Sequence, residues 1–228
     1  ALLDVQQNDE SRGAEVRASQ IKAYAASINC KIRLLDHHSC FLGGIEWPNL
    51  AHVGATGTAE TVEVVCGNNE DIQIQINSRE AAELLVLSAL DGLVAASVNA
   101  ADTLAVLVNM TFELGMSQRR VALWKIADIL DEHCPVGHVF NETPGHGWMK
   151  VVRKLRARCQ HHDIASMVRQ PSSTLMVPPD ELEIPRDFLL KGHNDPRLSA
   201  YAESVKDKTL ELILNSAKVI TDDPQHAA

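Results

Sequence analysis

Apolar residues recur at intervals of three and four through two long stretches of the chain, the spacing that places them on one side of an α-helix. In residues 15–41 this side includes Ile28 and Leu35. Residues 78–114 are mostly apolar and contain no proline. They predict a helix of about 55 Å at a rise of 1.5 Å per residue.

The same spacing predicts three shorter helices later in the chain. They cover residues 117–133, 148–169 and 198–220. In the first of them we expect four apolar side chains to face the core: Val121, Trp124, Ile126 and Leu130. The stretches 136–147 and 171–185 are rich in glycine, proline and other turn residues, so they predict irregular connections.

Two short stretches rich in β-branched residues lie between the two long predicted helices. Residues 61–66 hold three valines, and residues 71–76 alternate strictly between polar and apolar side chains. The residues between them, 67–70, read Gly-Asn-Asn-Glu, which is typical of a tight turn. The pattern predicts a β-hairpin inserted at about residues 61–76, lying on the helical body or extending a sheet of a partner.

The composition agrees with a mainly α fold. The chain has 228 residues, of which 45% are apolar and only 4% aromatic, a balance that favours helices packed through aliphatic side chains. A chain of this length buries a sizeable core without disulfides. No linker or repeat divides it, so we predict one domain over residues 1–228: a bundle of about five helices with the inserted hairpin.

Charge and cysteine use limit the classes of function. The 21 Lys and Arg against 30 Asp and Glu give a net charge of −9, which disfavours a general nucleic-acid coat protein or attachment to an anionic membrane. The five cysteines are widely spaced and read as reduced thiols. The N-terminus lacks a signal-peptide pattern, and the apolar stretch 92–112 carries Asn99, Asp102 and Asn109, so we expect a cytoplasmic protein outside the membrane.

The sequence has no recognised metal-binding pattern. His133, Cys134 and His138 surround a predicted turn but lack the ligand spacing of a zinc site. Residues 36–38 read Asp-His-His, the motif for which one class of phosphoesterases is named, but those enzymes need further aspartates on earlier strands. We therefore expect neither a metal nor a cofactor.

The acidic charge is unevenly distributed along the chain. Residues 143–162 contain no Asp or Glu and carry five basic residues: Lys150, Arg153, Lys154, Arg156 and Arg158. The other 16 basic residues against 30 acidic ones leave the rest of the chain at 16 − 30 = −14. A basic helix on an acidic protein suits a phosphate that approaches one face. Alternatively, the basic side chains solvate the outer face of a helix whose Val151, Val152 and Leu155 are buried.

At this segment the sequence resembles a known family. The matching run is W-x-K-x-x-x-x-L-R-x-x-x-x-H: Trp148, Lys150, Leu155, Arg156 and His161. Together with the preceding long apolar helix, it resembles the HEPN (higher eukaryotes and prokaryotes nucleotide-binding) helical bundles over roughly residues 15–220. Active members of that family are metal-independent ribonucleases that dimerise so that the Arg and His of both protomers line one cleft.

The resemblance implies roles for individual residues. Arg156 would stabilise the pentavalent phosphate, because a guanidinium binds phosphate oxygens in a bidentate manner. His161 would act as general acid or base while the ribose 2′-hydroxyl attacks and leaves a cyclic phosphate. Four further basic side chains would bind the substrate: Lys150, Arg153, Arg158 and His162.

Two features keep a non-catalytic alternative open. The family usually has a polar residue after its Arg, whereas this chain has Ala157. Five residues turn an ideal helix by about 140°, so Arg156 and His161 would not share a face. Arg158 and His162, four residues apart, would share a face. Either pair could act only if the helix ends near His162 or if a partner protomer supplies the second group; otherwise the histidines cap the helix or stand exposed at its end.

Two functional hypotheses follow. The first is a HEPN-like homodimer that binds RNA or a nucleotide through residues 150–162 and, if it is an enzyme, acts as a metal-independent endoribonuclease. The second is a non-catalytic helical interaction protein, such as a component of a defence or toxin–antitoxin pair, whose protein partner the sequence does not identify.

Overall fold

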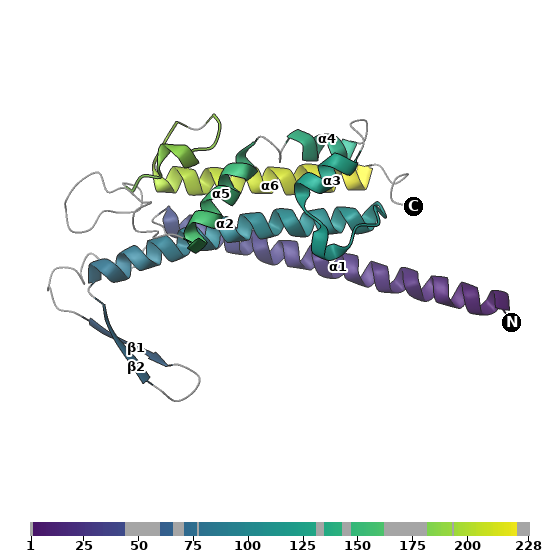
Figure 1. Cartoon of the computed structure of the whole chain (residues 1–228), viewed down its shortest axis with the longest axis horizontal. Helices are drawn as coiled ribbons and strands as arrows, with labels where there is room; N and C mark the ends of the chain where they lie inside the picture. The colour runs from purple at the N-terminus through teal and green to yellow at the C-terminus, as the bar shows by residue number, and fades with distance from the viewer. Residues whose placement is uncertain are drawn as a thin grey trace.

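The computed structural model describes most of the chain: residues 2–43, 60–65, 71–76, 78–130, 135–142, 147–161, 182–192 and 194–222. It places side chains over a smaller set: 13–43, 86–130, 135–140, 147–159, 182–192 and 194–221. Within the described residues the fold is mainly helical, with six α-helices (Figure 1). The predicted fold class, a helical bundle, is confirmed.

Three long helices form the body of the molecule. Helix α1 (Leu2–Leu42) and helix α2 (Ser78–Thr111) run antiparallel, and α6 (Leu198–Asp222) packs across both (Figure 1). Helix α1 begins well before residue 15, the predicted start. The prediction missed these first turns because they lack the apolar periodicity on which it rests. The other two lie close to their predicted positions.

Gly92 on α2 makes room for the His38 ring of α1. A Cβ atom at this position would lie 2.4 Å from the imidazole ring, so a larger residue would require the His38 side chain to move. A buried hydrogen bond joins α2 to α6: the hydroxyl oxygens of Ser97 and Thr209 lie 2.7 Å apart. Because Thr209 donates its own proton to the carbonyl of Val205, Ser97 is the donor of this pair.

The prediction of one helix over residues 117–133 is wrong. The chain instead forms a 3-10 turn, η3 (Gln118–Arg120), and a short helix α3 (Leu123–Ile129), because Val121 and Ala122 between them are extended. Of the four residues expected to face the core, Ile126 and Leu130 are buried and Val121 is half-buried. Trp124 is 47% exposed and faces outward.

A helix also occupies part of the stretch predicted to be a loop at 136–147. Helix α4 (Pro135–Glu142) begins with proline, which is favourable at the first helical position because its missing N–H has no helical partner there. Val136 and Phe140, four residues apart, are buried on one side of it.

Helix α5 (Trp148–His161) begins where it was predicted to begin. The second part of the predicted helix, up to residue 169, and most of the predicted connection 171–185 lie outside the described residues. The chain is described again from Leu182, where Glu183 pairs with Arg197 in an isolated antiparallel bridge and the turn η5 (Arg186–Phe188) follows.

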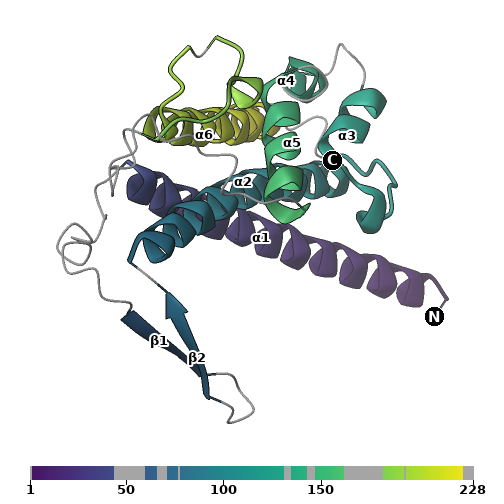
Figure 2. The ribbon, with the colours of Figure 1, turned by 60° about the vertical axis from the view of Figure 1, so that its left-hand side comes forward.

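Two short strands lie between α1 and α2 in the chain. Strands β1 (Glu60–Val65) and β2 (Asp71–Ile76) pair antiparallel, with Val62 opposite Ile74. They extend away from the helices in both ribbon views (Figures 1 and 2). The predicted turn at 67–70 lies outside the described residues, so an inserted hairpin stays a prediction.

Helix α2 is the most apolar of the described helices. Its segment Val86–Thr111 is long and apolar enough to cross a membrane by length and composition alone, and 61% of that segment is buried inside the described fold. Its buried residues include Leu90, Leu93, Leu104 and Val108, each at most 2% exposed, so α2 supplies much of the core on which the shorter helices pack.

Candidate phosphate-binding site on helix α5

Four buried side chains fix the orientation of α5. Met149, Val152, Leu155 and Cys159 recur at helical spacing and are at most 7% exposed, so they form the inner face that packs toward α2. The remaining faces carry the basic residues. Lys150, Lys154 and Arg158 are exposed, whereas Arg153 and Arg156 are half-buried at the margin between the two helices.

Arg153 forms an ion pair with Asp102 on α2. The two side chains keep 31% and 42% of their surface exposed, so the pair lies at the rim of the α2–α5 contact and not inside the core. Burial raises the pKa of the Asp102 carboxyl, and the charges of Arg153 and then Arg156 oppose that rise. Asp102 therefore attracts both arginines.

Arg156 differs from its neighbour in that it forms no ion pair with another described residue. The Nε atom of each of the two arginines is buried and has no hydrogen-bond partner among the described residues. Leaving a buried N–H group without an acceptor is costly. An anion that supplied an acceptor to this group would remove that cost. Arg156 thus has a balancing charge nearby in Asp102 and an N–H group that the described fold leaves unused.

Of the two predicted histidines, His161 is the last described residue of α5, and His162 lies outside the described residues. The expectation that the helix ends near His162 stays a prediction, because the residues that follow His161 also lie outside the described part of the chain. The structure describes no side chain for His161.

A second group of polar residues surrounds the C-terminal part of α5. The charge of Asp91 acts on both His38 and Cys159, and the Oδ1 atom of Asp91 is buried without a hydrogen-bond partner among the described residues. Burial raises the pKa of the Cys159 thiol to about 11, and Asp91 adds to that rise. Burial lowers the pKa of His38, helped by the adjacent His37. Cys159 is therefore a protonated thiol at neutral pH and a poor nucleophile.

No group of His, Cys, Asp or Glu side chains that could hold a metal ion occurs among the described residues. Residues 36–38 lie near the end of α1, as predicted, with the rings of His37 and His38 in a T-shaped contact of 5.4 Å between centroids. His138 lies on α4, while His133 and Cys134 lie outside the described residues.

Two features of this region were not predicted from the sequence. Asp102 was considered only as an obstacle to a membrane span, and its pairing with Arg153, 51 residues later, depends on tertiary packing. Arg119, Arg120 and Trp124 were assigned to a regular amphipathic helix, although two adjacent arginines beside an aromatic residue are a signal that the sequence does contain.

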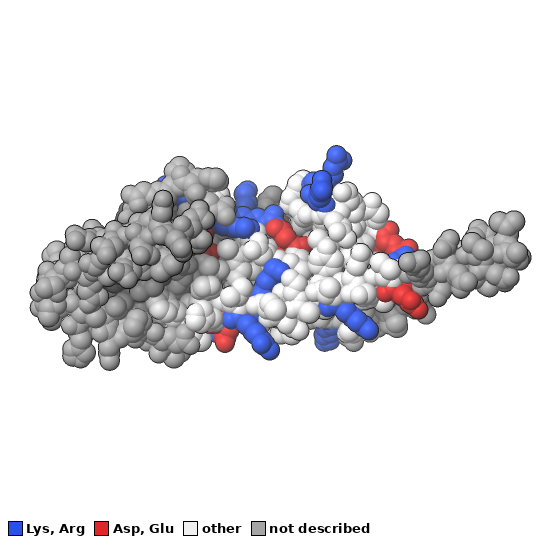
Figure 3. All heavy atoms as spheres, turned by 90° about the horizontal axis from the view of Figure 1, so that it is seen from below, with Lys and Arg blue, Asp and Glu red and all other residues white. Residues whose placement is uncertain are grey.

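The basic side chains do not form one continuous patch on the face shown in Figure 3. On the face viewed from below in Figure 3, Lys and Arg side chains lie mostly apart, separated by uncharged surface. No known protein family, curated protein or solved structure matches the chain.

Proposed function

We propose that this protein binds RNA through helix α5 and cleaves it without a metal ion, as a HEPN-like cytoplasmic homodimer. The observation that carries the proposal is the half-buried Arg156, which forms no ion pair with another described residue and whose Nε, like that of Arg153, has no hydrogen-bond partner among them. At the rim of the α2–α5 contact a hydrogen bond to a phosphate oxygen is stronger than in water, because the local dielectric is lower.

The exposed residues of α5 support this assignment. Lys150, Lys154 and Arg158 project from a helix without acidic residues, so a phosphate chain meets positive charge as it approaches Arg156. The rest of the chain has a net charge of 16 − 30 = −14. This contrast favours the approach of an anion to α5, since the net negative charge of the rest of the chain repels it.

The proposed reaction is an internal transesterification. The 2′-oxygen of a ribose attacks the adjacent phosphorus while a histidine takes the 2′-hydroxyl proton, and the bond from phosphorus to the 5′-oxygen breaks. The 5′-oxygen leaves as a hydroxyl after receiving a proton, and the other product ends in a 2′,3′-cyclic phosphate. Arg156 stabilises the charge that develops on the phosphoryl oxygens, and His161 carries the proton.

A dimer explains how the two groups meet. Arg156 and His161 are five residues apart on α5, about 140° around the helix, so one protomer alone does not present them side by side. If two copies of α5 lie across a common cleft, the Arg of one copy faces the His of the other. In such a dimer, an inserted hairpin formed by β1 and β2 would extend a sheet of the partner or contribute to the dimer contact.

A non-catalytic interaction protein, such as one component of a toxin–antitoxin pair, is the second candidate. The observation that favours it is the ion pair of Arg153 with Asp102, which already engages one end of a guanidinium predicted to bind the substrate. Ala157, exposed on α5, agrees with this alternative because the family's usual polar residue is missing there.

The test compares three variants of the full chain in EDTA. We expect Arg156→Ala and His161→Ala to slow cleavage of a single-stranded RNA by at least about 100-fold, the contribution usual for a positioned acid–base group or charge stabiliser. Arg33→Ala, which removes an exposed arginine from α1, is the matched control and should cleave like the wild type. Circular dichroism and thermal melting verify that all three remain folded. Equal cleavage by all four proteins, or no cleavage by the wild type, overturns the nuclease proposal.

A further inference from the structure

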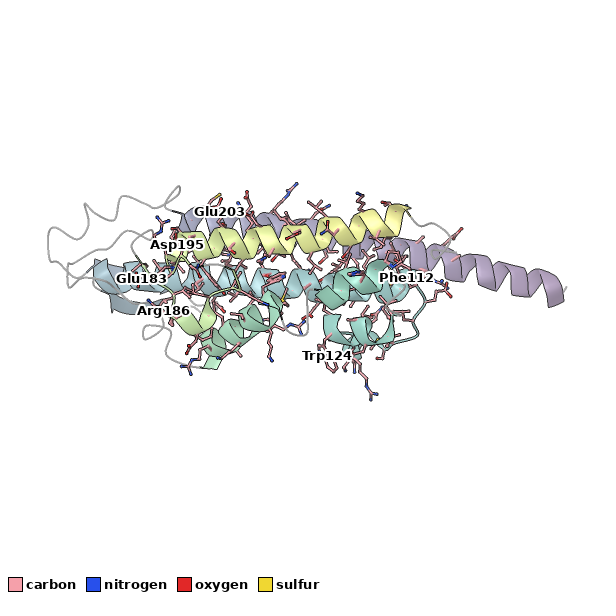
Figure 4. All side chains as sticks on the ribbon, turned by 90° about the horizontal axis from the view of Figure 1, so that it is seen from above. Phe112, Trp124, Glu183, Arg186, Asp195 and Glu203 are labelled. Carbon is pink, nitrogen blue, oxygen red and sulfur yellow. The ribbon has the colours of Figure 1, made fainter. Side chains whose placement is uncertain are left out.

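Trp124 lies exposed on a short segment with three positive charges. Its side chain is 47% exposed, and Figure 4 places it at the edge of the molecule. Arg119 and Arg120 of η3 are exposed, and neither forms an ion pair with another described residue. The ammonium of Lys125 lies 5.3 Å from the centroid of the Trp124 ring. An aromatic face beside arginines is the usual composition of a surface on which bases stack.

The core contacts of α3 explain why Trp124 faces outward. Leu123, Ile126, Ala127 and Leu130 are all buried and occupy one side of the helix at the helical spacing. Trp124 follows the first of these by about 100° and therefore lies outside the buried side. Its exposure is a consequence of how α3 packs, so the ring remains available without any change in the fold.

The segment is held in place before any ligand binds. The side-chain amide of Asn109, itself buried near the end of α2, donates to the carbonyl of Met116 at 3.0 Å and accepts from the Met116 N–H at 3.1 Å. On the other side, the Tyr24 hydroxyl of α1 donates to the Gln118 side chain at 3.3 Å. A surface fixed in this way loses little conformational entropy on binding.

The charges around the ring favour an anionic ligand. Residues 117–127 contain no Asp or Glu. Asp128, exposed one turn after Trp124, is the acidic residue nearest in the helix, and Glu113 is already paired with Arg17. We call Trp124, Arg119 and Arg120 the Trp124 patch. A second copy of the chain fits this patch less well than an anion, because a two-fold contact through it would bring the arginines of both copies together.

The position of this patch relates it to α5. Helices α3 and α5 both pack on α2, and both lie on the same side of it in Figures 2 and 4. We propose that a base of single-stranded RNA stacks on Trp124 while the adjacent phosphates bind Arg119 and Arg120. This inference rests on the proposed function, since it gives that function its substrate class: an unpaired strand that continues along α2 beyond α5.

The test measures binding without cleavage. A 2′-O-methyl oligouridine labelled with a fluorophore reports binding by anisotropy and lacks the nucleophile that the proposed reaction needs. We expect Trp124→Ala to weaken binding by about 10-fold or more, because stacking on an aromatic ring contributes to that extent per base. Trp124→Phe should recover part of the affinity. Ile129→Ala, which alters an exposed residue of the same helix, is the matched control and should bind like the wild type.

Two further measurements separate the possible outcomes. Trp124→Phe should remove most of the quenching of intrinsic fluorescence that the oligonucleotide causes, although Trp47 and Trp148 remain. Arg119→Ala with Arg120→Ala should reduce the slope of log K against log salt by about 1.4, at about 0.7 per phosphate contact. Unchanged affinity in Trp124→Ala, or a change in its oligomeric state in light scattering with RNA binding intact, overturns the inference. Loss of binding in Trp124→Ala supports the inference even if the wild type does not cleave RNA and the nuclease proposal fails.

Discussion

Helix α5 and the η3–α3 segment carry similar charge but use it differently. Both pack on α2 from the same side, and each has basic residues and a tryptophan near its start. In α5 two arginines lie half-buried beside Asp102, whereas Arg119 and Arg120 are exposed and form no ion pair with another described residue. Half-buried arginines have restricted positions, as the proposed reaction requires, whereas exposed ones can follow a flexible strand.

The largest expected effect concerns the leucine that anchors each segment. Leu155 on α5 and Leu123 on α3 are both fully buried. Leu155→Ala should lower the free energy of unfolding by about 2–5 kcal/mol, the range for a leucine cavity that collapses little. Leu123→Ala should cost less, since the seven-residue α3 lies near the surface and can relax. Urea unfolding measures both, and a larger cost for Leu123→Ala would contradict this difference in packing.

A smaller effect is expected when the carboxylate beside α5 is neutralised. Asp102→Asn removes the partner of Arg153 and should cost about 1 kcal/mol of stability, because the ion pair is partly exposed to solvent. It should also tighten RNA binding several-fold, since Arg153 and Arg156 no longer attract a competing carboxylate. Chemical denaturation and anisotropy measure the two quantities.

The matched control for this change is Asp128→Asn, which removes the same charge next to Trp124. It should leave stability within about 0.5 kcal/mol of the wild type, as is usual for exposed positions. Weaker RNA binding by Asp102→Asn than by the wild type would show that Asp102 positions the arginines and does not compete with phosphate.

The smallest effect is a dependence of stability on pH that arises from His38, which lies on α1 against Gly92 of α2. Burial and then the charge of His37 lower the pKa of His38 from its ordinary value of 6.5, and the charge of Asp91 opposes this shift. A lowered pKa means that the unfolded chain binds the proton more readily. The contribution of neutral His38 is therefore complete above pH 6.5 and is lost as the pH falls toward its folded value.

Stability measured by denaturation between pH 7.5 and about 5 tests this sign. The wild type should lose more stability over this range than His38→Gln, whose side chain does not titrate. Parallel pH profiles for the two proteins would show that His38 is not the group responsible. Arg33→Ala serves again as a control and should follow the wild-type profile.

The long helices could be predicted from the sequence because their signal is regular over many turns. Helix α2 lacks proline and stays apolar, and α6 keeps a regular apolar side. The first turns of α1 lack such a regular apolar side, so the helix was predicted to begin at residue 15, whereas it begins at Leu2. Short elements were less predictable: α4 was taken for a loop because of Pro135 and Gly137, although proline is favourable at the start of a helix.

The error at Trp124 shows how a wrong boundary changes a predicted face. A helix assumed to begin at Ser117 places Trp124 in register with Val121, toward the core. Since the helix begins at Leu123, the buried side is set by Leu123, Ile126 and Ala127, and Trp124 lies outside it. The basic character of α5 could be predicted from composition, but the pairing of Arg153 with Asp102 could not, because it joins two helices far apart in the chain.

Cleavage of two matched oligonucleotides in EDTA tests the central claim most directly. One is single-stranded RNA, and the other has the same sequence with 2′-O-methyl riboses. We expect the protein to bind both and to cut only the RNA, leaving 2′,3′-cyclic phosphate and 5′-hydroxyl ends. Cleavage of the methylated strand, or intact RNA at protein concentrations that saturate binding, would contradict the proposal that α5 of this protein promotes attack by the ribose 2′-hydroxyl.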